Sequence, residues 1–321
     1  MSAHERRTGF RATVYDKIRT TYLATLGRTV RRNLVYTSGA FEQFERQGIH
    51  ITDARHFEDP IPSVRCLKSN YPETDETSYP GIDFNAQRQL EYLTTVLPRY
   101  RQEFFSFPEK ADNLDTYSRL NDSFPQLDAL AYWAFIRELR PSRILEIGSG
   151  NSSILAYHAL RKNLHGKLTV IDPFPRDFTQ AFAGQVSSEV EFNGLPVERV
   201  DPVIFAGLGE NDILFIDGSH VIKIGNDVDY VFNRILPRLN PGVFVHVHDI
   251  YLPFQYPRAY FLEEHRFWNE QPALALYLAD NPKAEIQFGS AFVLRRSANE
   301  VARILPDPAA RSGASLWYRR T

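Results

Sequence analysis

Four residues that can do acid–base or metal chemistry stand directly after two short apolar runs of the sequence. Asp217 and His220 follow the run Ile-Leu-Phe-Ile, and His248 and Asp249 follow the run Val-Phe-Val-His-Val. Because the carboxyl ends of neighbouring parallel strands meet at one edge of a sheet, we expect these four side chains to converge there.

Two chemistries suit such a cluster. In the first, Asp217 and Asp249 bind a divalent metal, which lowers the pKa of a substrate hydroxyl. In the second, no metal takes part: His220 or His248 is the general base, and one of the aspartates orients it. A purely structural alternative is that the acids cap helices and the histidines are satisfied residues at the rim of the sheet.

A glycine turn indicates what binds beside this cluster. The apolar segment 143–147 runs into Gly148-x-Gly150, and Asn-Ser-Ser follows as a helix start, which is typical of a strand–turn–helix unit that holds a nucleotide. A dinucleotide fingerprint has Gly or Ala where Ser153 stands. Glu146, two residues before the first glycine, would repel a pyrophosphate but could hold the amino group of a methionine moiety. The turn therefore favours S-adenosylmethionine over NAD.

Acidic residues after the next two strands fit the rest of such a ligand. Asp172 follows the second apolar run, 26 residues after Glu146, where a carboxylate can accept hydrogen bonds from a ribose diol. Asp201 follows a weaker run and could accept the adenine amino group. Asp172 could instead cap the end of its strand, and Asp201 could instead be the N-cap of a helix.

Aromatic and acidic residues after the fifth strand predict the acceptor side of the site. Tyr251, Tyr256 and Trp268 would form a shaped wall, and Glu264 and Glu270 could pair with a cationic substrate. The alternative is that the aromatic residues belong to the core and that the acids lie on a solvated face.

Strands and helices alternate from about residue 124, and they must position these residues. The strands are short, continuous apolar runs, as in a parallel sheet that is covered on both faces. The expected strands are 143–147, 167–171, 197–200, 213–216, 243–247, one within 285–294, and 315–319. The expected helices are 127–139, 152–160, one around 178, 203–208, 221–236, 259–268, 273–279 and 298–305. The pattern predicts a doubly wound α/β domain.

The first 120 residues lack this alternation and are expected to form a cap with the substrate region, ahead of a domain over 121–321. Helices are predicted over 13–31 and 85–105. The proline-rich segment 48–81 between them is predicted to be irregular throughout and is expected to be a lid. Eight Lys or Arg residues within 1–35 indicate a basic amphipathic helix. That helix could touch a membrane or a partner, but packing on the body or on a second subunit is favoured.

Bulk composition narrows the class of protein. The chain has 321 residues, 43% hydrophobic content and a formal net charge of −2, which argues against a nucleic-acid binder. Cys66 is the one cysteine, so no internal disulfide can form. No stretch approaches the 18 apolar residues of a membrane helix. We expect a cytoplasmic protein without a membrane or nucleic-acid partner, and a homodimer is one option.

Taken together, these motifs resemble the class I S-adenosylmethionine-dependent methyltransferases over roughly residues 117–294. More narrowly, they resemble the bacterial small-molecule branch, similar to catechol and macrocin O-methyltransferases. The segments that carry this likeness are Glu146–Ser153, Phe215–His220, His246–Pro257 and Trp268–Gln271.

The resemblance implies a Rossmann-like, seven-stranded, mostly parallel sheet whose last strand is antiparallel. It also implies S-adenosylmethionine as the cofactor. The residues expected around it are Glu146, Gly148, Ser149, Gly150, Ser152, Ser153, Asp172, Pro173, Asp201, Asn121 and Asp217. The stretch expected to cover cofactor and substrate contains Tyr117, Asn121, Phe124, Asp128 and Tyr132.

The metal-binding motif departs from the catechol-type relatives. They carry an Asp after the fourth strand and an Asp-Asp or Asp-Asn pair after the fifth. Here that pair is His248-Asp249, so Asp217 and Asp249 match and the third ligand does not. Mg²⁺ or another divalent metal thus remains one of two alternatives.

The prediction is methyl transfer to an oxygen of a small polar metabolite, in natural-product or sugar biosynthesis for example. The first alternative is N-methylation of an amine or guanidine, such as arginine, with Glu263, Glu264 or Glu270 pairing the cation. The second is a regulatory subunit that binds S-adenosylmethionine without chemistry of its own. An NAD-dependent enzyme is the weakest interpretation.

Overall fold

The computed structural model describes residues 21–22, 38–50, 52, 58–71 and 77–321. The chain divides into two compact units, residues 1–71 and 72–321, which are described separately. The division falls at residue 71, whereas the sequence analysis placed a domain boundary near residue 120. The expected role of the N-terminal region as a cap stays a prediction.

The first unit contains two described helices, α2 (Ser38–Glu45) and α3 (Val64–Asn70). The second of these lies inside the segment 48–81 that we expected to be irregular throughout. The basic helix predicted over 13–31 lies outside the described residues, apart from residues 21 and 22.

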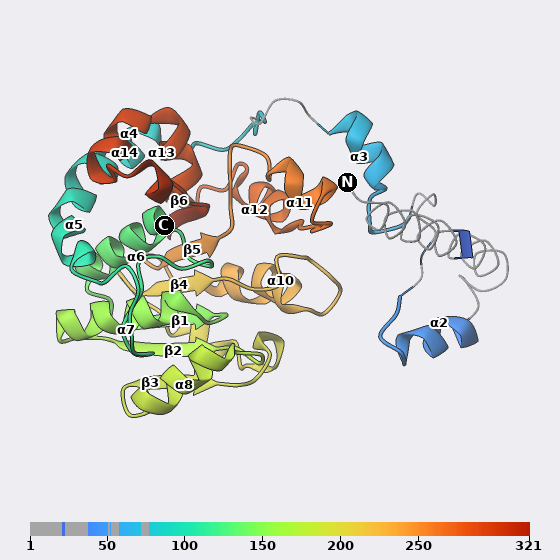
Figure 1. The fold of residues 1–321 in the computed structure, drawn as a ribbon, viewed down its shortest axis with the longest axis horizontal. Helices are drawn as coiled ribbons and strands as arrows, with labels where there is room; N and C mark the ends of the chain where they lie inside the picture. The colour runs from blue at the N-terminus through green and yellow to red at the C-terminus, as the bar shows by residue number, and fades with distance from the viewer. Residues whose placement is uncertain (1–20, 23–37, 51, 53–57, 72–76) are drawn as a thin grey trace, which may run out of the picture. The chain divides into compact units, whose positions relative to one another are not determined.

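The second unit is built on one sheet of seven strands in the order β3-β2-β1-β4-β5-β7-β6. Figure 1 shows them one above another, with β3 at the bottom of the view. Strands β1 to β5 are parallel, and β7 is antiparallel to both of its neighbours, β5 and β6. The strands are β1 (Arg143–Ile147), β2 (Lys167–Ile171), β3 (Val190–Asn193), β4 (Ile213–Ile216), β5 (Phe244–His248), β6 (Ala284–Gly289) and β7 (Ser315–Arg320). The predicted doubly wound, mostly parallel sheet with an antiparallel last strand is confirmed.

Helices cover both faces of this sheet, as a parallel sheet requires. The α-helices are α4 (Ala86–Glu91), α5 (Leu97–Phe105), α6 (Gln126–Leu139), α7 (Asn151–Asn163), α8 (Asp177–Val186), α9 (Val203–Ala206), α10 (Asp227–Tyr230), α11 (Arg258–Leu262), α12 (Glu270–Leu278), α13 (Ser290–Arg296) and α14 (Ala298–Ile304). Residues of α5–α8, α13 and α14 share one apolar core, and residues of α9 and α12 share the other. In the part of the chain that the structure describes, no helix is long and apolar enough to cross a membrane.

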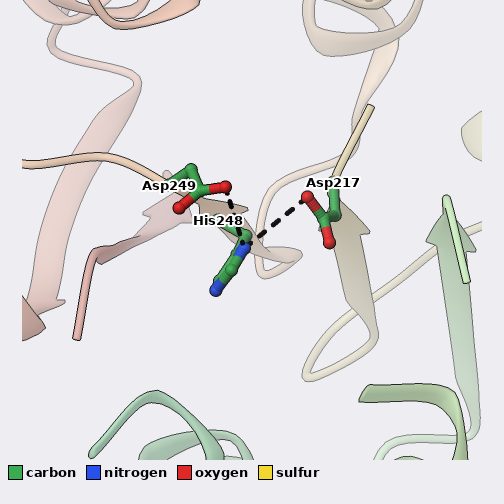
Figure 2. Close-up of side chains that lie close together, drawn as sticks. All are labelled: Asp217, His248 and Asp249. Carbon is green, nitrogen blue, oxygen red and sulfur yellow. Dashed lines mark ion pairs between the residues drawn. The ribbon is translucent and has the colours of Figure 1, made fainter. Parts of the chain in front are cut away.

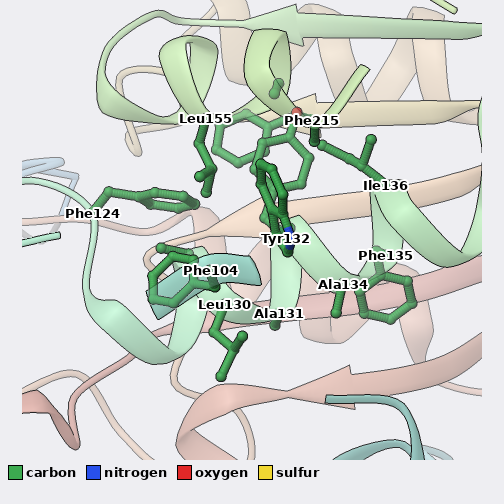
Figure 3. Packing of buried hydrophobic residues seen from close by; sticks show 14 of the residues in the cluster. Phe104, Phe124, Leu130, Ala131, Tyr132, Ala134, Phe135, Ile136, Leu155 and Phe215 are labelled. Atoms are coloured by element: carbon green, nitrogen blue, oxygen red, sulfur yellow. The ribbon is translucent and has the colours of Figure 1, made fainter. Parts of the chain in front are cut away.

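Helix α6 is the centre of the larger core. Its Tyr132 stacks on Phe215 of β4 with the ring centroids 5.1 Å apart, and its Phe135 stacks on Trp317 of β7 at 3.9 Å. Figure 3 shows Tyr132 and Phe215 near Phe124 and Leu155, with Phe135 further along α6. These aromatic contacts hold α6 against β4 and β7.

Four predicted elements differ from the structure. The third strand is β3, and the segment predicted for it contains a 3₁₀ turn, Val197–Arg199. The segment 285–294 is strand only up to Gly289, where α13 begins. The helix predicted from residue 221 begins at Asp227. The helix predicted over 259–268 is α11, which begins one residue earlier and already ends at Leu262. Short apolar runs fit a buried strand and a buried helix equally well, which explains the second error.

Candidate functional site

A cleft of about 1170 Å³ lies along the carboxyl edge of the parallel strands. It is lined by the loops that follow β1, β2, β4 and β5, where a doubly wound sheet binds its ligands. Its lining includes Gly148, Ser149, Asp172, Pro173, Asp217, His220, His248, Asp249, Tyr251 and Trp268, as the sequence predicted.

The four residues after β4 and β5 converge in this cleft, and we call them the Asp/His cluster: Asp217, His220, His248 and Asp249. The Asp217 Oδ1 atom lies 3.3 Å from His220 Nε2 and 3.5 Å from His248 Nδ1. The Asp249 Oδ2 atom lies 3.5 Å and 3.7 Å from the same two nitrogens. Figure 2 shows Asp217 and Asp249 on either side of the His248 ring.

Each imidazole of the cluster also faces a buried carboxylate on its other side. His220 Nδ1 lies 2.9 Å from Glu270 Oε2, and His248 Nε2 lies 3.5 Å from Asp128 Oδ2. Glu270 and Asp128 are fully buried. Asp128 also accepts a hydrogen bond from the backbone N–H of Ala314, at 2.8 Å. Each histidine thus lies between the carboxylates of Asp217 and Asp249 on one side and a single buried carboxylate on the other. That buried carboxylate is Glu270 for His220 and Asp128 for His248.

The backbone at the cluster adopts a conformation that non-glycine residues rarely take. His220 has φ +59° and Asp249 has φ +56°. The carbonyl of His220 accepts hydrogen bonds from the N–H groups of Asn269 and Glu270, which fixes the turn. Left-handed residues of this kind cost about 1–2 kcal/mol each and concentrate at functional sites.

Charge within the cluster decides the protonation of its histidines. Burial by itself would lower the pKa of His220, but its hydrogen bonds with Asp217 and Glu270 raise that pKa to about 10. The pKa of His248 is likewise raised by Asp217 and Asp128, against the effect of burial. In the ligand-free protein the surrounding carboxylates thus favour the protonated form of both rings. The general-base role predicted for either ring requires that the ring first lose its proton.

Gly148 brings the first loop against the end of β4. Its φ is +87°, and a Cβ atom there would lie 2.1 Å from the backbone oxygen of Asp217. Gly150 has φ 165°, and a Cβ atom on it would meet nothing within 4 Å among the described residues. Close packing thus requires a glycine only at the first of these two positions. Gly148 places the loop after β1 directly against the backbone of Asp217, a member of the Asp/His cluster.

Contrary to our prediction, Glu146 does not line the cleft. Its side chain is fully buried, and Oε1 accepts hydrogen bonds from the hydroxyls of Ser152 and Ser153. Burial raises the pKa of this carboxyl to about 8, although the two hydroxyls lower it. Gly150, Ser152 and Ser153 also lie outside the cleft lining drawn from the described residues. Glu146, Ser152 and Ser153 therefore stabilise the loop after β1 through hydrogen bonds to one another and do not line the cleft.

Replacing Glu146 with Gln is expected to flatten the pH dependence of stability. Because the folded pKa of about 8 exceeds the ordinary value of 4.5, the stability linked to this carboxyl is complete at low pH. It is lost as the pH rises toward 8, by roughly 4–5 kcal/mol. Chemical denaturation across this pH range should show the free energy of unfolding falling more steeply in the wild type than in Glu146→Gln. Equal slopes would contradict the assignment, and the exposed Glu285→Gln is the control.

Asp172, which we predicted to bind the ribose, is accessible to a ligand from the cleft. Asp172 lines the cleft, and its carboxylate accepts hydrogen bonds from the Ser149 hydroxyl and from the N–H of Phe174. Asp201, predicted for adenine, lies outside the lining that the described residues form, and its side chain accepts a hydrogen bond from Val203 N–H instead. Asp201 therefore closes a local turn just before α9, whose N-cap is Pro202.

The predicted acceptor-side residues divide into two groups. Tyr251 and Trp268 line the cleft, and Trp268 packs on His220 with the ring centroids 4.3 Å apart. Tyr256 and Tyr117 are buried in the core, and Glu264 pairs with Arg266 at 2.8 Å.

Asn121 accepts hydrogen bonds from the N–H groups of Ser123 and Phe124. It shapes the turn before α6, whereas Asp122, Ser123 and Pro125 line the cleft.

Tyr260, Arg266 and the pairing of Glu270 and Asp128 with the histidines were not predicted from the sequence. Tyr260 and Arg266 line the cleft, and the Arg266 guanidinium lies over the rings of Tyr260 and Trp268 at 5.0 and 5.3 Å. The only signal for Glu270 was its place in the Trp-Asn-Glu-Gln motif, which does not say whether a carboxylate faces substrate or histidine.

Comparison with known proteins places residues 145–250 in a family model described as a methyltransferase domain. An uncharacterized protein of Archaeoglobus fulgidus is 34% identical over 180 residues, which cover 54% of this chain and 80% of that protein. Among solved structures, an O-methyltransferase from Bacillus cereus in complex with S-adenosylhomocysteine is 12% identical, with a TM-score of 0.40 and coverage of 74% of this chain and 98% of that one. The O-methyltransferase TomG from Streptomyces achromogenes, involved in tomaymycin synthesis and in complex with S-adenosylmethionine, is 17% identical, with a TM-score of 0.38 and coverage of 74% and 97%.

Proposed function

Because this chain belongs to the class I S-adenosylmethionine-dependent methyltransferases, we propose that it methylates a hydroxyl oxygen of a small polar metabolite. The observation that carries the proposal is the Asp/His cluster. Its four ionisable side chains lie in the same cleft as the glycine loop and Asp172. A donor site and a proton-accepting site thus share one cavity, which a methyl transfer to a hydroxyl requires.

The cofactor would occupy the half of the cleft formed by the loops after β1 and β2. Gly148 and Ser149 approach it with backbone, and Asp172 accepts the ribose hydroxyls. Phe174 lines the same half with 87% of its surface exposed, so its ring is available to a flat adenine. The sulfonium would then face the ends of β4 and β5.

The acceptor would lie against the part-exposed carboxylates of the cluster. The Asp217 side chain is 31% exposed and that of Asp249 is 22% exposed, whereas the His248 side chain is 4% exposed. The two aspartates would hold the hydroxyl, and the carboxylate of Asp249, whose pKa is raised by burial, would accept its proton. Trp268 and Tyr260, whose ring centroids lie 5.1 Å apart, offer a wall for a ring-shaped acceptor.

N-methylation of a cationic substrate has less support. Glu264 is already paired with Arg266, and Glu270 is buried against His220.

The direct test is calorimetric titration with S-adenosylhomocysteine, followed by assays with labelled S-adenosylmethionine on a panel of catechols, phenols, sugars and amines. We expect micromolar binding and transfer to hydroxyl acceptors. Binding without transfer to any acceptor would favour a regulatory subunit, and an absence of binding would contradict the proposal. Transfer to amines alone would favour the N-methylation alternative.

Substitution of Asp172 tests the ribose position. Asp172→Ala is expected to weaken S-adenosylhomocysteine binding by about 1–3 kcal/mol, since charge-assisted hydrogen bonds to the ribose are lost. The matched control is Asp201→Ala, which removes an acid outside the cleft lining that the described residues form and should leave affinity unchanged. Calorimetry on both variants measures the effect. If Asp201→Ala lowered affinity more than Asp172→Ala, the assignment of these two residues would be reversed.

A further inference from the structure

The part of the cleft lining that comes after β5 in the chain differs in charge from the rest. Among the lining residues that the structure describes beyond residue 250, only Arg266 and Arg295 are charged. The acids of the same lining all come from earlier segments, and Asp217 and Asp249 of the Asp/His cluster are among them. The acceptor half of the cleft thus combines carboxylates at the strand ends with guanidinium groups from the segments that follow β5.

Arg266 is separated from the Asp/His cluster by one aromatic ring. The Trp268 ring packs on His220 with the centroids 4.3 Å apart. The Cζ atom of Arg266 lies 5.3 Å from the centroid of the same indole and 5.0 Å from that of Tyr260. A ligand that reaches from the cluster to this guanidinium therefore has to span about the width of the Trp268 side chain.

Arg295 is held by the same segment of the chain. It lies in α13, and its Cζ atom is 4.2 Å from the centroid of the buried Phe254 ring. The backbone N–H of Phe254 donates to the carbonyl of Tyr251, which lines the cleft. Stacking on a ring uses the face of a guanidinium, whereas its N–H donors point outward in the plane. Aromatic contacts thus restrain both arginines without consuming their donors.

The ion pair between Arg266 and Glu264 positions this guanidinium without using all of its donors. The Glu264 Oε2 atom lies 2.8 Å from Nη2 of Arg266, and Glu264 is outside the lining that the described residues form. A guanidinium has five N–H donors in a planar fork. A second anion can therefore contact Arg266 from the cleft while Glu264 keeps its place.

The uncharged residues of the same lining indicate what the body of the acceptor is made of. Tyr251, Tyr260 and Trp268 offer aromatic surface, and Ala291 and Leu294 of α13 add aliphatic surface. Sites for small molecules combine an apolar lining with a few polar groups that fix the orientation of the ligand. An apolar body about one ring long, with a hydroxyl at one end and an anionic group at the other, matches this lining.

We propose that Arg266 and Arg295 bind a carboxylate of the acceptor, so that the substrate is a hydroxylated aromatic acid. Its hydroxyl would lie at Asp217 and Asp249, and the two arginines would determine specificity. Arginine binds carboxylate and phosphate with the same bidentate geometry, so both anions have to be compared. The position of the hydroxyl rests on the proposed function, but binding of the anion can be measured without methyl transfer.

The test measures the binding of matched probes to the full-length protein, with and without S-adenosylhomocysteine. The probes are 4-hydroxybenzoate, 4-hydroxyphenyl phosphate and the neutral 4-hydroxybenzamide, titrated separately by calorimetry. We expect the benzoate to bind about 10–100-fold more tightly than the amide, since hydrogen bonds to charged groups are stronger than those between neutral groups. Equal or weaker binding of the benzoate, or no binding of it, would overturn the proposal. A preference for the phosphate over the benzoate would replace the aromatic acid with a phosphorylated acceptor.

Variants test the two arginines separately. Arg266→Met and Arg295→Met are each expected to weaken benzoate binding by about 10-fold and to leave the affinities for the benzamide and for S-adenosylhomocysteine unchanged. Arg296→Met is the matched control, because Arg296 also lies in α13 but outside the lining that the described residues form. Wild-type benzoate affinity in Arg266→Met and Arg295→Met, or an equal loss in Arg296→Met, would contradict the site. The wild-type comparison of the probes does not depend on the folding of any variant.

Titration of the same samples with S-adenosylhomocysteine separates the two hypotheses. Cofactor binding by a protein that does not prefer the benzoate would overturn the carboxylate site and leave methyl transfer standing. A preference for the benzoate without cofactor binding would support the carboxylate site and contradict methyl transfer.

Discussion

Asp217→Asn is expected to reduce the methyl-transfer rate by about 10²–10⁴-fold while the protein still binds S-adenosylhomocysteine. Among the described residues, its carboxylate is the one group that lies within 3.5 Å of both imidazoles of the cluster. The amide keeps the shape of the side chain but removes the negative charge, and two buried imidazolium rings then lose a counter-ion. The acceptor hydroxyl also loses one of the two carboxylates that would hold it.

The measurement is single-turnover transfer from labelled S-adenosylmethionine, combined with calorimetry. Asp229→Asn is a suitable control, because Asp229 follows the same strand but binds Gly225 and Asn233 outside the cleft lining that the described residues form. A loss of cofactor affinity that matched the loss of rate would mean that Asp217 serves the cofactor rather than the acceptor. An unchanged rate would contradict the acceptor site altogether.

Gly148→Ala is expected to abolish cofactor binding and to lower the free energy of unfolding by several kcal/mol. The added Cβ would lie 2.1 Å from the backbone oxygen of Asp217, and the backbone at φ +87° is unfavourable for alanine. Backbone cannot move aside as a flexible side chain can. The loop must therefore leave β4, which disturbs the cofactor loop and the Asp/His cluster together.

Gly150→Ala is the matched control for this prediction. Its backbone is extended, and an added methyl group would meet no described atom within 4 Å, so we expect the variant to fold and to bind S-adenosylhomocysteine within a few-fold of the wild type. Thermal unfolding and calorimetry on both variants give the comparison. Similar losses in Gly148→Ala and Gly150→Ala would show that the turn is sensitive throughout and that the contact with Asp217 is not decisive.

The local signals in the sequence predicted the sheet well. The bounds of β1, β2 and β4 agree with the predicted strands, because each is a short, mainly apolar run that a glycine or an aspartate follows. The convergence of Asp217, His220, His248 and Asp249 was also predictable. It follows from the rule that parallel strands bring their carboxyl ends to one edge, and this rule needs no knowledge of packing.

The failures have a common physical cause. Glu146 stands where a motif predicts a ligand contact, yet the side chain turns behind the loop to Ser152 and Ser153. Tyr117 was expected at the substrate and packs against Phe104 and Phe107 in the core. A residue's type and position along the chain do not determine which neighbours bury it, since those neighbours come from other segments.

The sequence by itself therefore determined the class of the fold, the glycine turn and the residues that meet at the ends of β4 and β5. All of these depend on local hydrophobic pattern and on the geometry of parallel strands. Only the tertiary structure decided that His220 faces Glu270, fifty residues later in the chain, and that His248 faces Asp128, which precedes the first strand. Those pairings depend on how distant segments pack over the cleft, and they determine how the histidines are charged and oriented.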